Sequence, residues 1–333
     1  RDWNSDVCSS DLRLMRRNID GVLLLDKPLG LSSQQAVSQV RWLFNAAKAG
    51  HTGTLDPAAS GLLPVCLGEA TKFTQMLLDA DKAYRARVRL GVTTTTGDAE
   101  GEIIAKKPPA VDRAMIDATL ARFRGEIRQV PPMYSALKRD GKPLYEYARE
   151  GVEVEREART VVIYDLQIIV FKGEFLEITV SCSKGTYIRT LAVDIGDALG
   201  CGASLSALTR TGVGPLSLAD PQVHTLDALK ALSAAALEAC LMPVDTLVSN
   251  LPKLMLDAAS AARVLAGQRL PWGSARQFSA GDQDAPKPGF TRLYAMPNNQ
   301  FLGLAVVDER GGIAPKRLLA TVSDPAHGAL QNI

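Results

Sequence analysis

Short apolar runs and alternating segments predict β-strands in the first part of the chain. Val22 to Leu25 is continuously apolar and is followed by Asp26-Lys27-Pro28-Leu29-Gly30, a sequence typical of a buried strand that ends in a turn. From Tyr84 to Leu90 apolar residues alternate strictly with three arginines. One face of this expected strand therefore belongs to the core, and the other face is cationic.

Two longer apolar segments predict an antiparallel hairpin in the middle of the chain. The runs Val161 to Phe171 and Phe175 to Ser181 are rich in Val, Ile and aromatic residues, and Lys172-Gly173-Glu174 separates them. A connection this short joins neighbouring antiparallel strands. We therefore expect antiparallel pairing in the main sheet.

Helical periodicity marks two segments that follow predicted strands. Ser32 or Ser33 can cap the first helix, and Gly50 is expected to end it. Its apolar face is formed by Val37, Val40 and Phe44. The second helix is expected to end at Gly200. Its apolar face is formed by Ile188, Leu191, Ala192, Ile195 and Leu199.

The composition changes near Leu251-Pro252, which predicts a second, smaller β domain over residues 252–333. Within it we expect a short helix over 257–266, followed by Gly- and Pro-rich strands that extend through 301–307. The main domain is then expected over residues 19–251.

The segment RDWNSDVCSSDL at the beginning of the sequence has neither helical nor strand periodicity. We expect residues 1–18 to form a leader that is non-native or disordered, with Met15 as the natural start. This leader carries no functional argument.

Length and composition predict a globular protein without membrane spans or metal. The 333 residues are 46% hydrophobic and 22% charged, enough for a real core and about two domains. The longest clean apolar stretch near the start, Val22 to Leu25, is far too short to cross a bilayer. The five cysteines form no Cys-x-x-Cys pair and the three histidines are scattered, so we predict no disulfide framework, no metal and a cytoplasmic protein.

Positive charge is concentrated in one segment, although the net charge of the chain is only +2. Residues 122–149 hold seven basic and three acidic side chains, a local excess of four. Such a segment is typical of a phosphate-binding surface, but a solvated basic loop has the same composition. Its basic residues are Arg122, Arg124, Arg128, Lys138, Arg139, Lys142 and Arg149.

The segment from Ala49 to Pro64 is the densest candidate for a functional loop. It holds three glycines and two prolines in sixteen residues, which indicates a constrained backbone of the kind that often holds a functional group. Read alone, Asp56-Pro57 could be an ordinary turn and His51 a loop histidine. A phosphate-binding P-loop is excluded because no Gly-Lys-Ser/Thr follows the glycines.

Within this segment, Gly50 to Gly61 reads GHTGTLDPAASG and resembles the Gly-His-x-Gly-x-Leu-Asp-Pro-x-Ala-x-Gly motif of the TruB family of pseudouridine synthases. The resemblance covers about residues 19–251, and the last eighty or so residues look like the PUA-type RNA-binding module that the family often carries. The flanking segments that match in order are Asp26-Lys27-Pro28, Lys82-Ala83-Tyr84, Pro131 to Lys138, Cys182 to Thr190 and Leu208 to Gly214.

The resemblance implies an α+β pseudouridine synthase fold with a largely antiparallel mixed sheet, flanked by helices and followed by a small PUA-like β domain. It implies isomerisation of uridine 55 in the T loop of tRNA, without a cofactor. Asp56 would supply an ionised carboxylate that attacks the sugar or the base or stabilises the separated fragments. Arg189 would be its partner and could hold it by two hydrogen bonds, although alone it reads as a helix-surface arginine.

The remaining site residues are also implied by the resemblance. The target uridine must leave the T loop to be modified, and Tyr84 would stack on it, with its hydroxyl as a possible aid to removal of the C5 proton. Tyr187 and Leu208 would line the uridine pocket, and His51 would occupy the space that the nucleotide vacates. Without the motif, the two tyrosines and Leu208 would read as core residues. Lys27 and Pro28 are expected to support the floor of the site.

The basic segment coincides with the insertion by which the family closes over the T arm. We therefore expect Lys138, Arg139 and Lys142 to contact tRNA phosphates, with further RNA contacts from the terminal module and salt-sensitive binding. The expected partner is tRNA, and the protein is expected to act as a monomer.

Two alternatives from other classes stay open at this point. The chain could be a guide-dependent ribonucleoprotein subunit like the dyskerin relatives, although its basic insertion favours a stand-alone enzyme. It could be an RNA chaperone that refolds tRNA without catalysis, in which case its activity would survive replacement of Asp56. A generic hydrolase is a distant third, since no Ser-His-Asp arrangement or metal cluster is visible.

Overall fold

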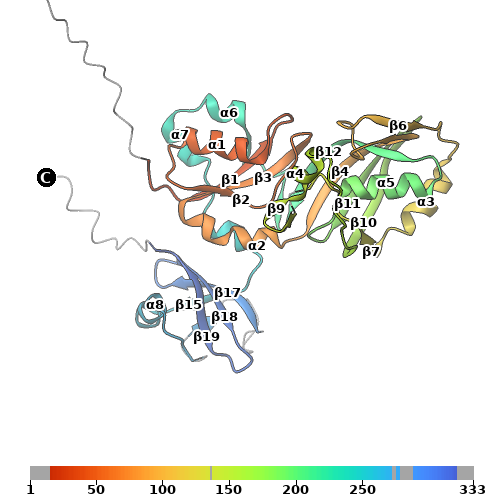
Figure 1. The fold of residues 1–333 in the computed structure, drawn as a ribbon. Coiled ribbons are helices and arrows are strands. Elements are labelled where there is room, and N and C mark those ends of the chain that lie inside the picture. Colours follow the sequence, from red (N-terminus) through yellow and green to blue (C-terminus); the bar gives the residue numbers. More distant parts are fainter. Residues whose placement is uncertain (1–15, 136, 272–274, 278–287, 321–333) are drawn as a thin grey trace, which may run out of the picture.

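The structure is a computed structural model that describes residues 16–135, 137–271, 275–277 and 288–320. The larger domain is built on a mixed sheet of ten strands (Figure 1). Eight of them follow one another in the order β14-β1-β3-β12-β4-β11-β10-β7, while β2 pairs with β3 and β13 with β12. The strands are β1 Gly21–Lys27, β2 Ala49–His51, β3 Ala59–Leu67, β4 Lys82–Leu90, β7 Gly125–Gln129, β10 Arg159–Lys172, β11 Phe175–Cys182, β12 Ala203–Val213, β13 Leu216–Ser217 and β14 Val223–Thr225.

Among these described strands, the β1–β14 and β3–β12 pairs are parallel and the other pairs across the sheet are antiparallel. The predicted α+β fold with a largely antiparallel mixed sheet is therefore confirmed. Two small hairpins lie outside this sheet, β5 (Val92–Thr94) with β6 (Ile103–Lys106), and β8 (Lys138–Arg139) with β9 (Lys142–Pro143).

Helices flank the two ends of the sheet (Figure 1). One group packs near β1 and β3, and the other lies beside β4, β10 and β12. The first group is α1 Ser33–Leu43, α6 Leu226–Lys230 and α7 Ala234–Ala239, and the second is α3 Arg113–Ala121 and α5 Ile188–Ala198. The 3-10 helices η1 (Gly68–Phe73) and η2 (Val244–Val248) pack with α2 (Thr74–Leu78) on the side that faces the second domain.

Helix α1 begins where its sequence predicts but ends earlier. The Ser32 side chain accepts a hydrogen bond from the Gln35 amide, and the Gln35 side chain accepts one from the Ser32 amide, which is a complete capping box. The prediction that Gly50 ends this helix is wrong. The helix stops at Leu43, because Asn45 adopts a left-handed conformation (φ 48°) and turns the chain into β2, where Gly50 pairs with Cys66 of β3.

Strand β4 has the predicted alternation, but its arginine face is not a free cationic surface. Arg85 and Arg87 both form ion pairs with Glu177 of the neighbouring strand β11. Arg89 pairs with Glu174 in the turn that precedes β11. Glu177 of β11 and Glu174 of the turn thus compensate much of the positive charge of the β4 arginines.

The hairpin and the second helix are confirmed. Lys172 of β10 pairs with Phe175 of β11, and Gly173 has the positive φ (59°) that a tight turn requires. Helix α5 ends at Ala198 with Gly200 in the left-handed conformation (φ 73°), as its sequence predicts.

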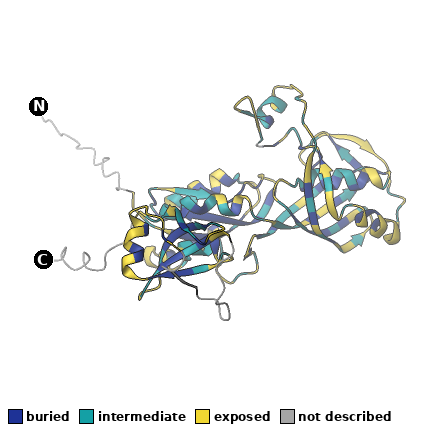
Figure 2. Cartoon of the chain, turned by 90° about the horizontal axis from the view of Figure 1, so that it is seen from below, coloured by how far each residue is buried: buried dark blue, intermediate teal, exposed yellow. Residues whose placement is uncertain are grey.

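Among the described residues, one core packs η1, α2 and η2 of the main domain against β1 and β3 on the side of the small domain, while two further cores of the main domain meet along β12. One of these two cores packs α5 and α3 against β4, β10 and β11, and the other packs α1 and α6 against β1 and β3. The partly buried Leu208 of β12 contacts both cores. Figure 2 shows the continuous buried interior of the sheet and the exposed outer faces of the helices. The candidate site lies between these cores, where rigid elements surround it.

A separate small sheet domain follows the main domain. Its strands have the order β16-β15-β17-β18-β19 and are accompanied by helix α8 (Ala258–Leu265), which Asp257 caps. The helix expected over 257–266 is therefore confirmed. The strands are β15 Lys253–Leu256, β16 Ala275–Gln277, β17 Gly289–Ala295, β18 Gln300–Val307 and β19 Ile313–Leu318.

The small domain is anchored on η1 and η2 of the main domain. The rings of Phe73 and Phe301 are 5.6 Å apart, and the Tyr294 hydroxyl donates a 2.6 Å hydrogen bond to Asp245. The Lys72 ammonium also donates to the Leu318 carbonyl oxygen at 3.0 Å. Apolar and polar contacts together hold the two domains against each other.

The beginning of the chain needs one correction. Residues 1–15 of the expected leader, Met15 included, lie outside the described residues. Arg17, which was assigned to the leader, belongs to the fold because its amide donates to the Asn45 carbonyl at 2.7 Å and its side chain pairs with Glu238. Elsewhere, no helix in the described part of the chain is long and apolar enough to cross a membrane.

Candidate active site

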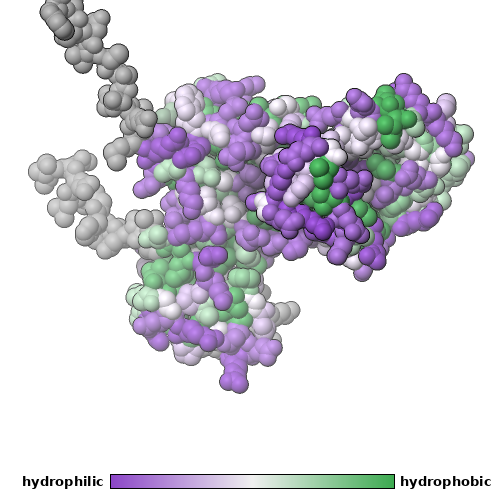
Figure 3. Space-filling view, in the orientation of Figure 1, coloured by the Kyte–Doolittle hydropathy of each residue, from purple (hydrophilic) through white to green (hydrophobic). Residues whose placement is uncertain are grey.

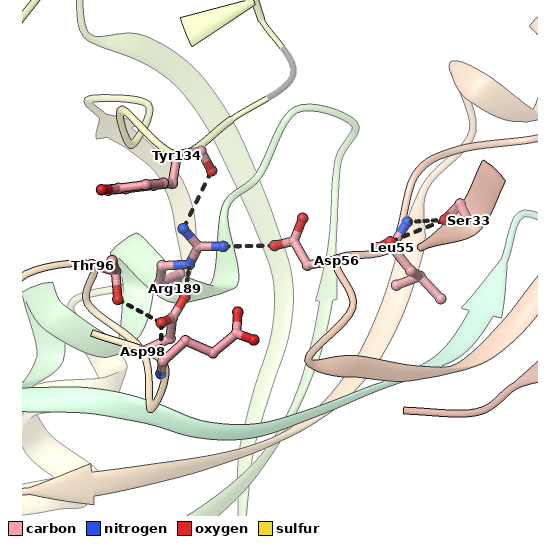
Figure 4. Close-up of polar contacts among 8 residues, drawn as sticks. Ser33, Leu55, Asp56, Thr96, Asp98, Tyr134 and Arg189 are labelled. Carbon is pink, nitrogen blue, oxygen red and sulfur yellow. Dashed lines mark hydrogen bonds and ion pairs between the residues drawn. The ribbon is translucent and has the colours of Figure 1, made fainter. Parts of the chain in front are cut away.

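Asp56 lies in the short loop between β2 and β3, and the backbone of this loop is held on both sides of it. The Ser33 hydroxyl accepts a hydrogen bond from the Leu55 amide (2.7 Å) and donates one to the Leu55 carbonyl (3.0 Å), as Figure 4 shows. After Asp56, the Gly30 amide donates to the Pro57 carbonyl at 2.8 Å. Ser33, the first residue of α1, and Gly30 in the turn after β1 thus fix the loop that holds Asp56.

The Asp56 carboxylate is paired with Arg189 at the start of α5. Arg189 Nη2 donates to Asp56 Oδ2 at 2.6 Å, and the side chain of Asp56 is 54% exposed while that of Arg189 is 12% exposed. The arginine also donates to the Tyr134 carbonyl through Nη1 at 3.3 Å. The carboxylate therefore stays open to a ligand on one side while its cation is held by the protein.

The expected two-pronged grip on Asp56 is wrong. Arg189 Nε lies 2.7 Å from Oδ2 of Asp98, so Nη2 alone donates to Asp56 (Figure 4). Asp98 is buried and is itself fixed by the Thr96 hydroxyl at 2.6 Å and the Glu100 amide at 3.1 Å. Asp98 therefore orients the arginine, and the arginine orients Asp56.

Sequence reasoning did not find Asp98. It follows the run of threonines over 93–96 and Gly97, outside every segment that matched the family motif. Gly97 has φ 76° and carries the turn that brings Asp98 to Arg189. A polar cluster directly after a strand, ending in Gly-Asp, is the one signal that could have pointed to it.

A cavity of about 230 Å³ opens beside Asp56. The charged residues Asp56, Asp98 and Arg189 lie in its lining, together with three of the predicted pocket residues. Those three are Tyr84, Tyr187 and Leu208. The structure thus places the proposed carboxylate and its arginine next to an aromatic and aliphatic surface, the arrangement that a planar polar ring requires.

Tyr84 and Tyr187, two of the tyrosines that line the cavity, are protonated at neutral pH. Burial raises the pKa of Tyr84 to about 12, partly offset by the positive charge of Arg210. Burial also raises the pKa of Tyr187. The backbone of Tyr187 is fixed by the buried Gln129, whose amide oxygen accepts from the Tyr187 amide at 3.0 Å.

His51 and Lys27 do not belong to the lining of this cavity. His51 Nδ1 accepts a hydrogen bond from the Gly53 amide at 3.2 Å, and burial lowers its pKa, so its ring is neutral at pH 7. Lys27 is fully buried and donates to the carbonyls of Pro28 (2.8 Å) and Leu31 (2.7 Å). Burial lowers the pKa of Lys27 to about 8, with the Asp56 charge acting in the opposite direction.

The basic segment is divided in the structure. Residues 125–129 form β7 at the edge of the main sheet, and Arg124 donates to the Leu166 carbonyl, so this part is structural. Beyond it, β8, β9 and helix α4 (Leu144–Arg149) present a mainly hydrophilic surface (Figure 3). Lys138 and Arg139 are exposed there, as a phosphate contact requires.

The local charge excess is smaller than the 122–149 window indicated. Lys142 forms an ion pair with Glu150 at 2.6 Å, and Arg139 Nη1 donates to the Glu155 carbonyl at 2.7 Å. We call residues 138–157 the projecting segment. Because residues 150–157 contribute four glutamates and one arginine, the net charge of this segment is close to zero.

In the described part of the chain, no three His, Cys, Asp or Glu side chains are grouped so that they could hold a metal ion.

Family comparisons agree with the geometry of the site. Residues 41–188 match the N-terminal domain of the TruB family pseudouridylate synthases, 189–249 match the tRNA pseudouridylate synthase B C-terminal domain, and 252–319 match the pseudouridine synthase II TruB C-terminal domain. Together these matches cover most of the chain, including the Asp56 loop, β12 and the small domain.

Relatives of the same family align with nearly the whole chain. A protein of Azoarcus sp. (strain BH72) named tRNA pseudouridine synthase B is 55% identical over 93% of this chain and 98% of its own length. Proteins of the same name from Chromobacterium violaceum and Burkholderia mallei are 54% and 56% identical, over 92% and 93% of this chain and 97% of each relative.

Solved structures show the same fold. A chain in the crystal structure of a Cbf5-Nop10-Gar1 complex is 29% identical, with a TM-score of 0.68 over 90% of this chain and 84% of that one. A chain in the structure of an H/ACA RNP bound to a substrate RNA containing 2′-deoxyuridine is 26% identical, with the same TM-score over 90% and 85%.

Proposed function

Because the chain belongs to the TruB family of pseudouridylate synthases and is a pseudouridine synthase, we propose that it isomerises uridine 55 in the T loop of tRNA, with Asp56 as the reacting carboxylate. The relatives that cover nearly its whole length are named for tRNA, which supports this substrate. The observation that carries the role of Asp56 is its position, at the edge of the cavity and in contact with Arg189.

The reaction needs a nucleophile and a shaped pocket, and it balances without a co-reactant. The bond between C1′ and N1 of uridine breaks, a bond between C1′ and C5 forms, the C5 proton leaves and N1 takes up a proton. The carboxylate of Asp56 attacks the sugar or the base, or stabilises the separated fragments, and each route requires its ionised form. Arg189 donates a 2.6 Å hydrogen bond to this carboxylate and holds it at the edge of the cavity.

The contacts from Asp98 through Arg189 to Asp56 hold the reacting carboxylate of Asp56 in place. Asp98 is buried and hydrogen-bonded, so it fixes the arginine from the protein side. Asp56, by contrast, has one oxygen on the arginine and is more than half exposed. Pre-arranged charges of this kind lower the reorganisation that a reaction requires.

The cavity supports recognition of an extruded base. We propose that uridine 55 leaves the T loop and stacks on Tyr84, with Tyr187 and Leu208 completing the pocket. Stacking of a base on an aromatic ring contributes about 1 to 3 kcal/mol, which offsets much of the few kcal/mol that extrusion requires. We further propose that His51 fills the space that the base vacates, since it precedes the same loop.

The tRNA body would be held at two places. The exposed Lys138 and Arg139 of the projecting segment are suited to phosphates of the T arm, with Lys142 available once its pair with Glu150 opens. The small domain over residues 252–333 would act as a PUA-like RNA-binding module. We also propose that the enzyme acts as a monomer. A tRNA substrate would place it in the cytoplasm.

The proposal is tested by tritium release. Purified protein is incubated with unmodified tRNA that carries tritium at uridine C5, with no cofactor, guide RNA or further protein added. We expect stoichiometric release from one position, and no release from a tRNA in which uridine 55 is replaced by cytidine. Release from other uridines in that control tRNA would contradict the T-loop assignment.

The same experiment addresses the guide-dependent alternative. The solved structures with similar folds come from complexes named with Nop10 and Gar1, or from an H/ACA RNP, which favours this alternative as the second candidate. A guide-dependent subunit would release no tritium until its guide and protein partners were supplied. Release by the protein alone would exclude that requirement.

A further inference from the structure

Arg210 is a buried arginine directly beneath the Asp56 loop. It lies on β12, opposite Tyr84 of β4 on one side and Gly61 of β3 on the other. Only 1% of its surface is exposed, and within the described chain it forms no ion pair with a carboxylate. A buried guanidinium without an anionic partner is costly, so its hydrogen bonds have to compensate.

All of those hydrogen bonds go to the catalytic side of the domain. Arg210 Nη2 donates to the Gly53 carbonyl (3.1 Å) and Nη1 to the Thr54 carbonyl (3.3 Å), both just before Asp56 in the loop. Its Nε donates to the Leu62 carbonyl of β3 at 2.8 Å. The positive charge of Arg210 also acts on the phenol of Tyr84, which lies opposite it in the sheet, and partly offsets the rise that burial gives to the pKa of that phenol. One side chain therefore holds the aspartate loop beside the aromatic residue of the cavity.

Two glycines of the sequence motif lie against this arginine. Gly53 has φ 137°, a conformation that favours glycine, and a Cβ there would be in ordinary contact with Arg210 Nη1 at 3.6 Å. Gly61 has φ 101°, and a Cβ there would stand 2.4 Å from the Arg210 carbonyl oxygen. The glycines thus allow the loop and β3 to approach Arg210 closely, in backbone conformations that other residues rarely adopt.

We propose that Arg210 is a positioning residue of the reaction, which holds the Asp56 loop and the Tyr84 phenol in one fixed relative geometry. This inference rests on the proposed function. Arginine suits the task because its five N–H donors point in different directions within one rigid plane. A lysine at this position has one nitrogen and cannot reach the Gly53, Thr54 and Leu62 carbonyls together.

The first test compares Arg210→Lys with Arg41→Lys. Arg41 is a matched control, because its guanidinium also donates to two backbone carbonyls of the main domain, Ala46 (3.2 Å) and Ala47 (2.8 Å), away from the cavity. For Arg210→Lys we expect tRNA affinity within about threefold of the wild type and a single-turnover rate on bound tRNA about 10²-fold lower, the effect of a misplaced reacting group. Arg41→Lys should leave that rate unchanged.

The second test asks whether Arg210 acts through Tyr84. Tyr84→Phe keeps the aromatic ring and removes only its hydroxyl. We expect this substitution to lower the single-turnover rate by a factor at least fivefold smaller in the Arg210→Lys background than in the wild type. Coupling of this kind appears when two residues act as one unit. A purely structural arginine would instead give independent, multiplicative effects together with a lower melting temperature.

A third variant keeps the inference falsifiable if Arg210→Lys does not fold. Gly53→Ala strains the backbone whose carbonyl Arg210 holds, because Gly53 has φ 137°, and we expect it to lower the single-turnover rate while tRNA affinity is retained. A wild-type rate for either folded variant, or multiplicative effects with Tyr84→Phe, would overturn the inference. The proposed function fails separately, through absence of tritium release by the wild type.

Discussion

The cavity beside Asp56 and the projecting segment differ in how their charges are held. At the cavity, Arg189 is fixed by the buried Asp98, and Arg210 is buried completely against backbone carbonyls. On the projecting segment, Lys138 and Arg139 are exposed and Lys142 pairs with an exposed glutamate. Fixed charges suit a chemical step, whereas exposed ones suit contacts that form and break with salt.

The sharpest test of this difference is Asp56→Asn. The amide keeps the shape of the side chain but cannot act as an anion, so we expect the single-turnover rate to fall on the order of 10⁴-fold or more, with tRNA affinity within a few-fold. Asp117→Asn is a matched control, because Asp117 is also 54% exposed and paired with an arginine, on the surface of α3. An RNA chaperone would keep its tRNA-refolding activity in both variants, and measurable turnover by Asp56→Asn would contradict the catalytic assignment.

Arg189→Lys should have the next largest effect. Lysine keeps the charge but cannot reach Asp98, the Tyr134 carbonyl and Asp56 at once, so we expect a rate loss of roughly 10²- to 10³-fold. Single-turnover kinetics and thermal melting are measured together, with Arg113→Lys as the control because Arg113 pairs with Asp117 on a helix surface. An undiminished rate would show that Arg189 is structural, and a collapsed melting temperature would point to packing.

The pH dependence of stability should separate a buried charge from an exposed one. Burial lowers the pKa of Lys27 to about 8 from 10.5, so the folded state releases this proton before the unfolded chain does. The penalty for burying the charge is fully present below pH 8 and disappears as the pH rises toward 10.5. Relative to Lys27→Met, the wild type should therefore gain up to about 3 kcal/mol between pH 8 and 10.5.

Urea unfolding at pH 7, 8, 9 and 10 measures this difference. Lys142→Met is the comparison, because Glu150 raises the pKa of Lys142 above its ordinary value. Its contribution is present below pH 10.5 and is lost only at higher pH, so its difference from the wild type should stay flat in this window. A flat difference for Lys27→Met as well would mean that its ammonium is solvated.

Much of the fold could be predicted because it depends on local patterns. The alternation in β4, the hairpin at Gly173 and the helix that ends at Gly200 are each encoded within about ten residues. The end of α1 was missed because it depends on the left-handed Asn45, which leaves no hydrophobic signal. Strand order also lay beyond these patterns, since the parallel β3–β12 pair joins segments far apart in the sequence.

The candidate site was predictable where a motif names a residue and not where a tertiary contact does. Asp56, Arg189, Tyr84, Tyr187 and Leu208 come together in the lining of one cavity. Asp98 and Arg210 were assigned no role, because their importance depends on burial, and charged residues are ordinarily expected at the surface. The charge count failed for a related reason, since Glu150 lies just outside the window that contains Lys142.

The smallest expected effect concerns the projecting segment and is a change in the salt dependence of tRNA binding. Each lost phosphate contact lowers the slope of log affinity against log salt by about 0.7 to 0.9. Replacing Lys138 and Arg139 with alanine should therefore lower the slope by about 1.5, while the rate on bound tRNA stays within about twofold. Lys142→Ala should change the slope less than either of these residues, because Glu150 already neutralises it. Glu150→Gln, which frees Lys142, should raise both affinity and slope. Equal slopes for all three variants and the wild type would show that the projecting segment is a solvated loop.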